Sequence, residues 1–241
     1  MGMTRYKEEA AHPFFLQLTK EDQHFLLYQG DRISFKSGTL LYQEGDELND
    51  VFIILSGTVR LTKSVQDDKS FVLHMKSKFQ VLGEEILFQN PVAALSVEVT
   101  KDTICIRLSR QQLEDAFHNN NRLKQAFIQL ASLNLLSTQA KFSDLFMYGK
   151  TGALYSVLIR LANSNGFLDE TGNIVIEQSL THQEIAQIIG TTRETVNRMI
   201  TELKDRRILS ATRSSIVIHD INVMKEALHC EKCPVAVCTI S

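Results

Sequence analysis

The sequence predicts an α+β fold with an N-terminal antiparallel β-roll, a long helix and a C-terminal winged helix–turn–helix. Three observations support this prediction. Short runs of β-branched and aromatic residues alternate with glycine turns over residues 32–107. A stretch without glycine or proline runs from about residue 120 to residue 148, and two short amphipathic segments flank Gly190.

The composition is that of a protein that forms a hydrophobic core. Of the 241 residues, 44% are hydrophobic and 22% are charged, which argues against disorder. No apolar run approaches the roughly 20 residues that cross a bilayer, and the N-terminus lacks the apolar stretch of a secretory signal. We therefore expect a cytoplasmic protein with no membrane partner. Because the formal net charge is −2, any affinity for DNA must come from a local basic surface.

The predicted β-roll rests on strand-like runs such as residues 51–55 and 58–62. Glycines fall between such runs, among them Gly57 and Gly83, where glycine supplies the positive φ of a tight turn. Many short strands with frequent turns are typical of an antiparallel roll or barrel. Cys105 lies in one of the runs, and we expect it to be a small buried strand residue.

The stretch from Asn120 to Tyr148 corresponds to about eight turns of helix. Small or apolar residues recur in it every seven positions, and Leu136 and Ser143 lie on a neighbouring track. The repeat consists of Ala126, Leu133, Ala140 and Met147. This period favours a helix that pairs with its symmetry mate, and hence a homodimer; a single helix packed on its own domain is the alternative. The segment 149–152, with two glycines, is expected to end the helix at a domain boundary.

A helix–turn–helix is predicted around Gly190. Residues 182–189 form a short amphipathic run that stops at this glycine, and Thr192 begins a second helix. Ala186 is small where two crossing helices must approach closely. A shared core is expected from Ile185, Ile189, Val196 and Ile200. Residues 209–218 follow as a predicted two-stranded wing.

The second of these helices carries side chains that can read DNA bases. Its N-terminal end enters the major groove in motifs of this kind, and the candidates there are Thr192, Arg193, Glu194, Asn197 and Arg198. Arginine can donate two hydrogen bonds to guanine and glutamate can accept one from cytosine, so this face favours G·C pairs. Phosphate contacts are expected from Lys204, Arg206, Arg207 and Arg213. A merely solvated charged face is the alternative, and the glycine turn and hydrophobic frame argue against it.

Three of the four cysteines lie close together near the C-terminus. Cys230, Cys233 and Cys238 have the spacing Cys-x2-Cys-x4-Cys. In a reducing cytoplasm such a group favours metal or redox chemistry over a disulfide. Soft thiolate ligands suit an iron–sulfur cluster, zinc or copper(I), and the residues alone leave these possibilities open.

The sequence lacks the motifs of common enzymes. It contains no phosphate-binding loop, no Ser-His-Asp grouping and no metal-ligand pair of histidines. His74 and His182 are each expected to have a local role or to be solvated. We therefore predict that the protein is not an enzyme.

Taken together, these features resemble the Crp/Fnr family. The segment from Leu180 to Arg198 is similar to the family's helix–turn–helix signature, and the glycine-spaced roll before a long helix resembles its sensor half. The resemblance covers nearly the whole chain. It implies a homodimeric transcription regulator that binds double-stranded DNA and works with RNA polymerase. Arg193, Glu194 and Arg198 match the family's pattern for reading a TGTGA half-site, which implies a palindrome of TGTGA and TCACA.

The resemblance also implies a division into four parts. These are a sensor β-roll, similar to cyclic-nucleotide-binding domains, over residues 1–119, a dimerisation helix over 120–149, a DNA-binding winged helix–turn–helix over 150–228, and a cysteine-rich cluster-binding tail over 229–241.

Cyclic nucleotide sensing is nevertheless not expected. Family members that bind cyclic AMP carry a Gly-Glu pair and, some ten residues later, an arginine that holds the phosphate. Gly83 and Glu84 match the first element, but residues 91–98 contain no arginine. A buried cyclic phosphate would lack a cation to pair with, so we expect a structural turn at Gly83 and no cyclic-nucleotide site.

The cysteine tail resembles that of Fnr proteins from Bacillus-type bacteria, in which three cysteines and an aspartate hold a [4Fe-4S] cluster. The resemblance implies cluster ligation by Cys230, Cys233, Cys238 and Asp144. Alternatives to Asp144 are His229 and Glu231.

A regulator of anaerobic genes that responds to oxygen would follow from such a cluster. Its loss, as in protein handled in air, would free the DNA-binding domain to reorient. The rival interpretation is a Crp-type regulator that senses a small effector in the β-roll and binds zinc through its cysteines.

Overall fold

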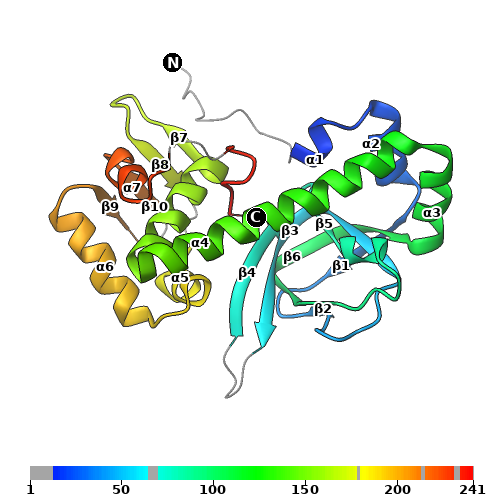
Figure 1. Cartoon of the computed structure of the whole chain (residues 1–241), viewed down its shortest axis with the longest axis horizontal. Coiled ribbons are helices and arrows are strands. Elements are labelled where there is room, and N and C mark those ends of the chain that lie inside the picture. Colours follow the sequence, from blue (N-terminus) through cyan, green and yellow to red (C-terminus); the bar gives the residue numbers. More distant parts are fainter. Residues whose placement is uncertain (1–12, 65–69, 178–179, 213–214, 231–233, 241) are drawn as a thin grey trace. The chain divides into compact units, whose positions relative to one another are not determined.

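The computed structural model describes residues 13–64, 70–177, 180–212, 215–230 and 234–240. These residues form two compact units (Figure 1). The division between the units falls inside helix α4 (Asn121–Asn165), between Leu133 and Asn134.

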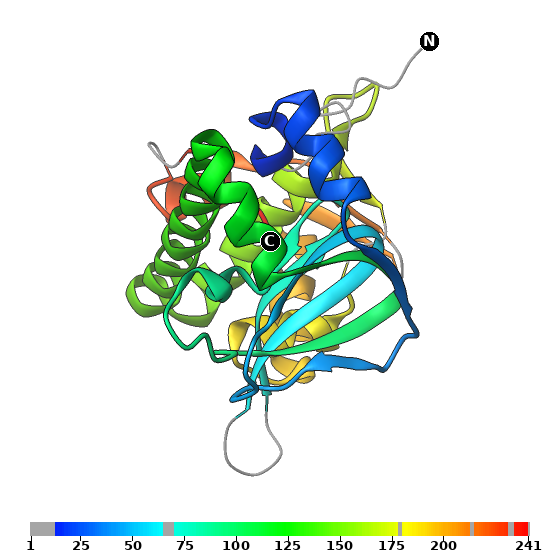
Figure 2. The same ribbon diagram turned by 90° about the vertical axis from the view of Figure 1, so that its right-hand side faces the viewer.

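The first unit is an antiparallel β-roll. Its strands are β1 (Asp31–Phe35), β2 (Leu40–Tyr42), β3 (Asp50–Ser64), β4 (Ser70–Ser77), β5 (Val81–Leu82) and β6 (Ser96–Ser109). They form one sheet in the order β1-β6-β3-β4, with β2 paired to β6 and β5 paired to β3, and every pairing is antiparallel. Figure 2 shows the sheet curving around its own interior. The predicted roll is confirmed.

Strand β3 divides its apolar side chains between two clusters, because side chains alternate between the faces of a strand and register shifts after Ile54 change that alternation. Val51 and Ile53 pack in one cluster with residues of the flanking helices, whereas Ile54 and Val59 pack in the other with Cys105. Cys105 is fully buried, as the sequence predicts, and burial raises the pKa of its thiol to about 12. A thiol with so high a pKa is unreactive at neutral pH.

Short helices flank the sheet of this unit. They are α1 (Pro13–Leu16), α2 (Lys20–Tyr28), the 3-10 helix η1 (Glu84–Leu87) and α3 (Arg110–Asn119). Both α2 and α3 begin with a capping box, formed by Thr19 with Asp22 and by Ser109 with Gln112.

Helix α4 is broken at Gly149, the first residue of the predicted helix end. This glycine has φ 63° and ψ −157°, a conformation that residues with a Cβ rarely adopt. The predicted helix end therefore falls at Gly149, where two helices meet at a kink, and the second helix continues to Asn165.

The predicted stripe of α4 is exposed at Leu136 and Met147, but its first residue is not. Ala126 is buried in the cluster that also contains Phe127 and Leu130, so it does not face outward. The large apolar residues that are exposed at seven-residue intervals are Ile128, Leu135 and Phe142. Phe142 also stacks on Phe146, with ring centroids 5.9 Å apart.

The second unit contains the predicted winged helix–turn–helix. Besides the C-terminal part of α4 it consists of β7 (Gly166–Leu168), β8 (Ile174–Glu177), α5 (His182–Ile189), α6 (Arg193–Asp205), β9 (Leu209–Ala211), β10 (Ser215–Ile218) and α7 (Asn222–Ala227). The four strands form an antiparallel sheet in the order β7-β8-β10-β9. Figure 1 shows α5 and α6 in yellow and orange. The predicted fold class is confirmed.

The turn between α5 and α6 is built as its sequence requires. Thr181 and Glu184 form a capping box at the start of α5, and Gly190 ends it in the left-handed conformation, with φ 64°. The core beneath the motif contains the predicted apolar residues, Ile185, Ile189, Val196 and Ile200.

Among the described residues, no helix has the length and apolar character that crossing a bilayer requires.

Candidate nucleic-acid interface and cysteine site

The predicted base-reading residues lie together on one exposed face of α6. Thr192, Arg193, Glu194, Asn197 and Arg198 are all exposed and occupy the N-cap and the first two turns. The opposite face of the helix is buried through Val196, Ile200 and Leu203. A helix with one face fixed in the core and a polar N-terminal face in solvent has the arrangement that major-groove binding needs.

Local hydrogen bonds cap the N-terminal end of α6 and stabilise the charged form of Glu194. The hydroxyl of Thr192 accepts a hydrogen bond of 3.3 Å from the backbone N–H of Thr195. Glu194 has a lowered pKa because its backbone N–H and the Thr192 side chain donate hydrogen bonds to its carboxylate, and nearby Arg193 favours the charged form. At neutral pH this face therefore presents a carboxylate acceptor beside arginine donors.

His182 lies close to this face, a relationship that the sequence did not suggest. Partial burial lowers the pKa of His182, and the charges of Lys204 and Arg193 lower it further, whereas a hydrogen bond with Asn197 raises it. The imidazole is therefore neutral at physiological pH, and it forms a hydrogen bond with the side chain of Asn197.

The predicted phosphate-binding residues lie at the other end of α6. Lys204, Arg206 and Arg207 are all exposed. Arg213, between the two wing strands, lies outside the described residues. Phosphate contact by these side chains stays a prediction.

The C-terminal tail and helix α4 enclose a small pocket within the second unit. Cys230 and Cys238 line it together with Asp144, so the structure brings three of the four predicted cluster ligands to one place. The complete lining consists of Ala140, Asp144, Ser156, Ile159, Arg160, Leu228, Cys230 and Cys238. Cys233 and Glu231 lie outside the described residues, and His229 is exposed and does not line the pocket.

Asp144 is held in this pocket by two donors. Its Oδ2 atom accepts a hydrogen bond of 2.5 Å from the hydroxyl of Ser156 and lies 3.5 Å from Nη2 of Arg160. The Arg160 side chain is only 2% exposed. Sequence analysis missed both partners, because a lone serine and arginine in a helix carry no motif.

The side chains that could ligate a metal in this pocket, two cysteines and an aspartate, are of the types that bind an iron–sulfur cluster. Thiolates are the usual ligands of such clusters, and a carboxylate can complete a set of three cysteines. A buried guanidinium would also offset the negative charge of a thiolate-ligated cluster. Within the described residues no group of three or more histidine, cysteine or acidic side chains has the arrangement of a metal site, and Cys233 is absent from that set.

In the β-roll, the glutamate that matches the Gly-Glu pair of cyclic-AMP-binding family members is engaged in an ion pair. Gly83, with φ 80°, is the N-cap of η1, as expected for a structural turn. The Glu84 carboxylate pairs at 2.8 Å with Lys76, whose ammonium group also donates to the Val81 carbonyl. Burial and the charge of Glu84 raise the pKa of the adjacent Glu85. The carboxylate that would meet a cyclic nucleotide is therefore already engaged with a lysine.

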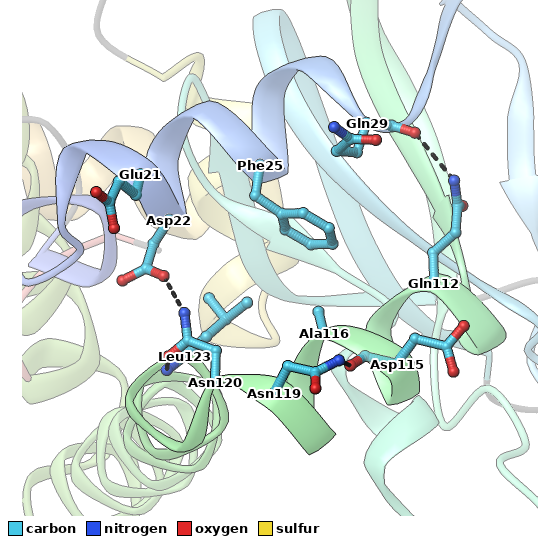
Figure 3. A pocket seen from close by; sticks show the side chains of 10 residues that line it. All are labelled: Glu21, Asp22, Phe25, Gln29, Gln112, Asp115, Ala116, Asn119, Asn120 and Leu123. Atoms are coloured by element: carbon cyan, nitrogen blue, oxygen red, sulfur yellow. Dashed lines mark hydrogen bonds between the residues drawn. The ribbon is translucent and has the colours of Figure 1, made fainter.

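A pocket of the β-roll unit lies between α2 and α3, and its lining is unsuited to anions. Figure 3 shows Asp22 accepting a hydrogen bond from Asn120, and the Gln112 amide donating to the Gln29 carbonyl. The ten lining residues, all within the described part of the chain, include three carboxylates and no lysine, arginine or histidine. These contacts join α2 to α3 and the start of α4, which is a structural role.

Comparisons with known proteins agree with both units. Residues 152–227 match the Crp-like helix-turn-helix domain, and residues 32–120 match the cyclic nucleotide-binding domain. The "Anaerobic regulatory protein" of Bacillus subtilis is 34% identical over 204 residues, which cover 84% of this chain and 85% of that protein. A "CRP-like cAMP-activated global transcriptional regulator" of Mycobacterium tuberculosis is 23% identical over 188 residues, covering 78% and 84% of the two chains.

A solved structure shows the same fold. A CooA mutant from Carboxydothermus hydrogenoformans matches with a TM-score of 0.74 at 19% identity, over 92% of this chain and 97% of that one. At this identity the likeness concerns the fold alone.

Proposed function

Because the chain belongs to the Crp/Fnr family of DNA-binding transcription regulators, whose members are not enzymes, we propose that it is a homodimeric oxygen-responsive regulator of anaerobic genes. In this proposal it carries a [4Fe-4S] cluster, binds a palindrome of TGTGA and TCACA in the cytoplasm, and acts with RNA polymerase. The similarity to an anaerobic regulatory protein supports the link to anaerobic genes.

The exposed N-terminal face of α6 is the observation that carries the DNA-binding part. Arg193 and Arg198 can each donate two hydrogen bonds to guanine, and Glu194, kept charged by its low pKa, can accept from the amino group of cytosine. Two such helices, one from each subunit, would read half-sites about one helical turn apart, which agrees with a palindromic site.

The exposed stripe on α4 supports the homodimer. Ile128, Leu135 and Phe142 are 51%, 59% and 65% exposed, which is unusual for large apolar side chains at regular seven-residue spacing. A second copy of the same helix would cover this stripe along its length.

The cluster is assigned to Cys230, Cys233, Cys238 and Asp144. When bound, it supplies an iron centre that oxygen can destroy. Cys230 and Cys238 contribute thiolates beside Asp144, and Arg160 compensates their negative charge. Because Asp144 lies on α4 and the cysteines lie on the tail, an intact cluster would add a ligand-mediated link between the tail and α4.

An anaerobic experiment tests these assignments together. Protein purified without oxygen should contain iron and acid-labile sulfide, and should shift a TGTGA palindrome at lower concentration than after exposure to air. A Cys233→Ser variant should lose both properties. The matched control is Cys105→Ser, since Cys105 is buried in the β-roll and should not affect the cluster.

The results of this experiment distinguish the cluster-based switch from the rival proposals. Bound zinc without sulfide would support the rival regulator with a small effector in the β-roll. Equal DNA binding by the Cys233→Ser and unaltered proteins without oxygen would refute the switch, while DNA binding itself would stand.

A further inference from the structure

One polar face near the end of α4 holds the C-terminal tail. Its residues are Ser156, Arg160, Asn163 and Ser164. Arg160 lies four positions from each serine and three from Asn163, which places the four residues on one side of the helix. We call these four residues the tail cradle. Their spacing is visible in the sequence, but their binding partner, the C-terminal tail, is seen only in the structure.

The cradle contacts four consecutive tail residues through the tail backbone. Arg160 Nη1 donates to the carbonyls of Val237, at 2.7 Å, and Thr239, at 3.3 Å. The amide of Asn163 donates to the Cys238 carbonyl at 2.9 Å. The hydroxyl of Ser164 accepts from the backbone N–H of Ile240 at 3.0 Å. Because these contacts fix main-chain groups, they set the path of the tail.

Arg160 connects the tail to the predicted carboxylate ligand. Its Nε donates to the Ser156 hydroxyl at 3.0 Å, and that hydroxyl donates to Asp144. Arginine is rarely buried unless all its donors are used, and its planar guanidinium can bind several acceptors at once. One buried side chain thus contacts the residues before and after Cys238 and also Asp144.

We infer that the tail cradle positions Cys238 beside Asp144 before any cluster binds, with Arg160 as its central positioning residue. This inference rests on the cluster function proposed above. A tail ordered in advance has already lost its conformational entropy, so cluster assembly needs to order only the remaining ligands. Arg160 itself is not a ligand in this proposal.

Thiol alkylation of the reduced, metal-free protein tests the cradle without a cluster. Iodoacetamide labelling of Cys238, followed by peptide mass spectrometry, should be roughly tenfold faster in Arg160→Lys, because lysine cannot replace all the charged hydrogen bonds of the guanidinium. Arg122→Lys, an exposed arginine at the start of α4, is the matched control and should react like the unaltered protein. The far-UV circular dichroism spectrum and melting temperature of each variant should match those of the unaltered protein, which shows that the unit containing Arg160 is folded.

A second variant protects the test against misfolding. If the spectrum or melting temperature of Arg160→Lys changes, then Asn163→Ala carries the test, since it removes only the bond to the Cys238 carbonyl. It should increase labelling of Cys238 about fivefold. Unchanged labelling of Cys238 in a folded cradle variant would overturn the inference.

Anaerobic iron loading then distinguishes the two proposals. Cradle variants should incorporate iron and sulfide at least about fivefold more slowly than the unaltered protein. Faster labelling with an unchanged loading rate would overturn the positioning role. If the unaltered protein binds no iron, the cluster function fails, and labelling alone decides whether the cradle orders the tail.

Discussion

The ammonium group of Lys76 lies 2.8 Å from Oε1 of Glu84 inside the β-roll, where the two side chains are only 4% and 15% exposed. Removing one partner of a buried pair leaves an uncompensated charge, which typically costs about 3–5 kcal/mol. We predict that Lys76→Met lowers the free energy of unfolding by about this amount, as measured by urea denaturation.

The double variant Lys76→Met with Glu84→Gln is the control for this pair. It removes both charges, so it should recover part of the lost stability, and a double-mutant cycle gives the coupling. A loss below about 1 kcal/mol in the single variant would show that the pair is not buried in solution.

Base reading by α6 predicts a sequence-dependent loss on substitution. Arg193→Ala should weaken binding to the TGTGA palindrome by about 1–3 kcal/mol and should change binding to an unrelated duplex little. Lys204→Ala, at the opposite end of the helix, should weaken binding to both duplexes alike and reduce the salt dependence by about one unit. Electrophoretic shifts at several salt concentrations measure both effects. Equal losses on both duplexes for Arg193→Ala would contradict base reading.

The lowered pKa of His182 predicts a stability change in mild acid. The unfolded chain binds a proton near the ordinary pKa of 6.5, whereas the folded chain resists protonation to a lower pH. Stability should therefore fall as the pH drops below about 6.5, and the loss should stop once the folded His182 is protonated. A His182→Gln variant should lose this part of the pH dependence. The check is an NMR titration, in which the His182 ring should titrate below the ordinary pKa of 6.5.

The assignment of Asp144 as the fourth ligand predicts a selective loss of iron. Even an outer-shell partner of a metal site contributes about 10–100-fold to affinity, so Asp144→Ala should reduce iron retention at least tenfold. His229→Ala should retain iron, because this exposed side chain lies outside the pocket. Iron content after anaerobic desalting measures both. Loss of iron in the His229 variant alone would transfer the ligand role to that histidine.

Local signals predicted the helix–turn–helix almost completely. Gly190 and the apolar residues on either side specify the turn and core through contacts between neighbouring residues, so the sequence contains the necessary information. The burial of Ala126 on α4 was not predicted, because its packing in the β-roll core depends on residues far away in the sequence. A seven-residue repeat of small residues cannot reveal such a contact.

The cysteine site was predictable only in part. The cysteine spacing is visible in the sequence, and Asp144 came from the family resemblance. Arg160, however, contacts Val237 across 77 positions of the chain, and nothing near either residue indicates the contact. Similarly, Lys76 gave no sign of its buried position, because strand alternation predicts burial without predicting an ion pair.

The exposed stripe of α4 gives the last prediction. Replacing Leu135 with glutamate puts a charge in the middle of an apolar face, and a paired helix would have to bury two such charges at its symmetric contact. Leu135→Glu should therefore be monomeric in size-exclusion chromatography with light scattering, where the unaltered chain should have twice the 27.3 kDa of one subunit. Gln129→Glu adds the same charge at an exposed position about 100° around the helix from Ile128, so it should remain dimeric. Because the palindrome requires two recognition helices, Leu135→Glu should also lose tight binding while keeping weak affinity for a half-site. A dimeric Leu135→Glu protein would place the subunit contact on another surface.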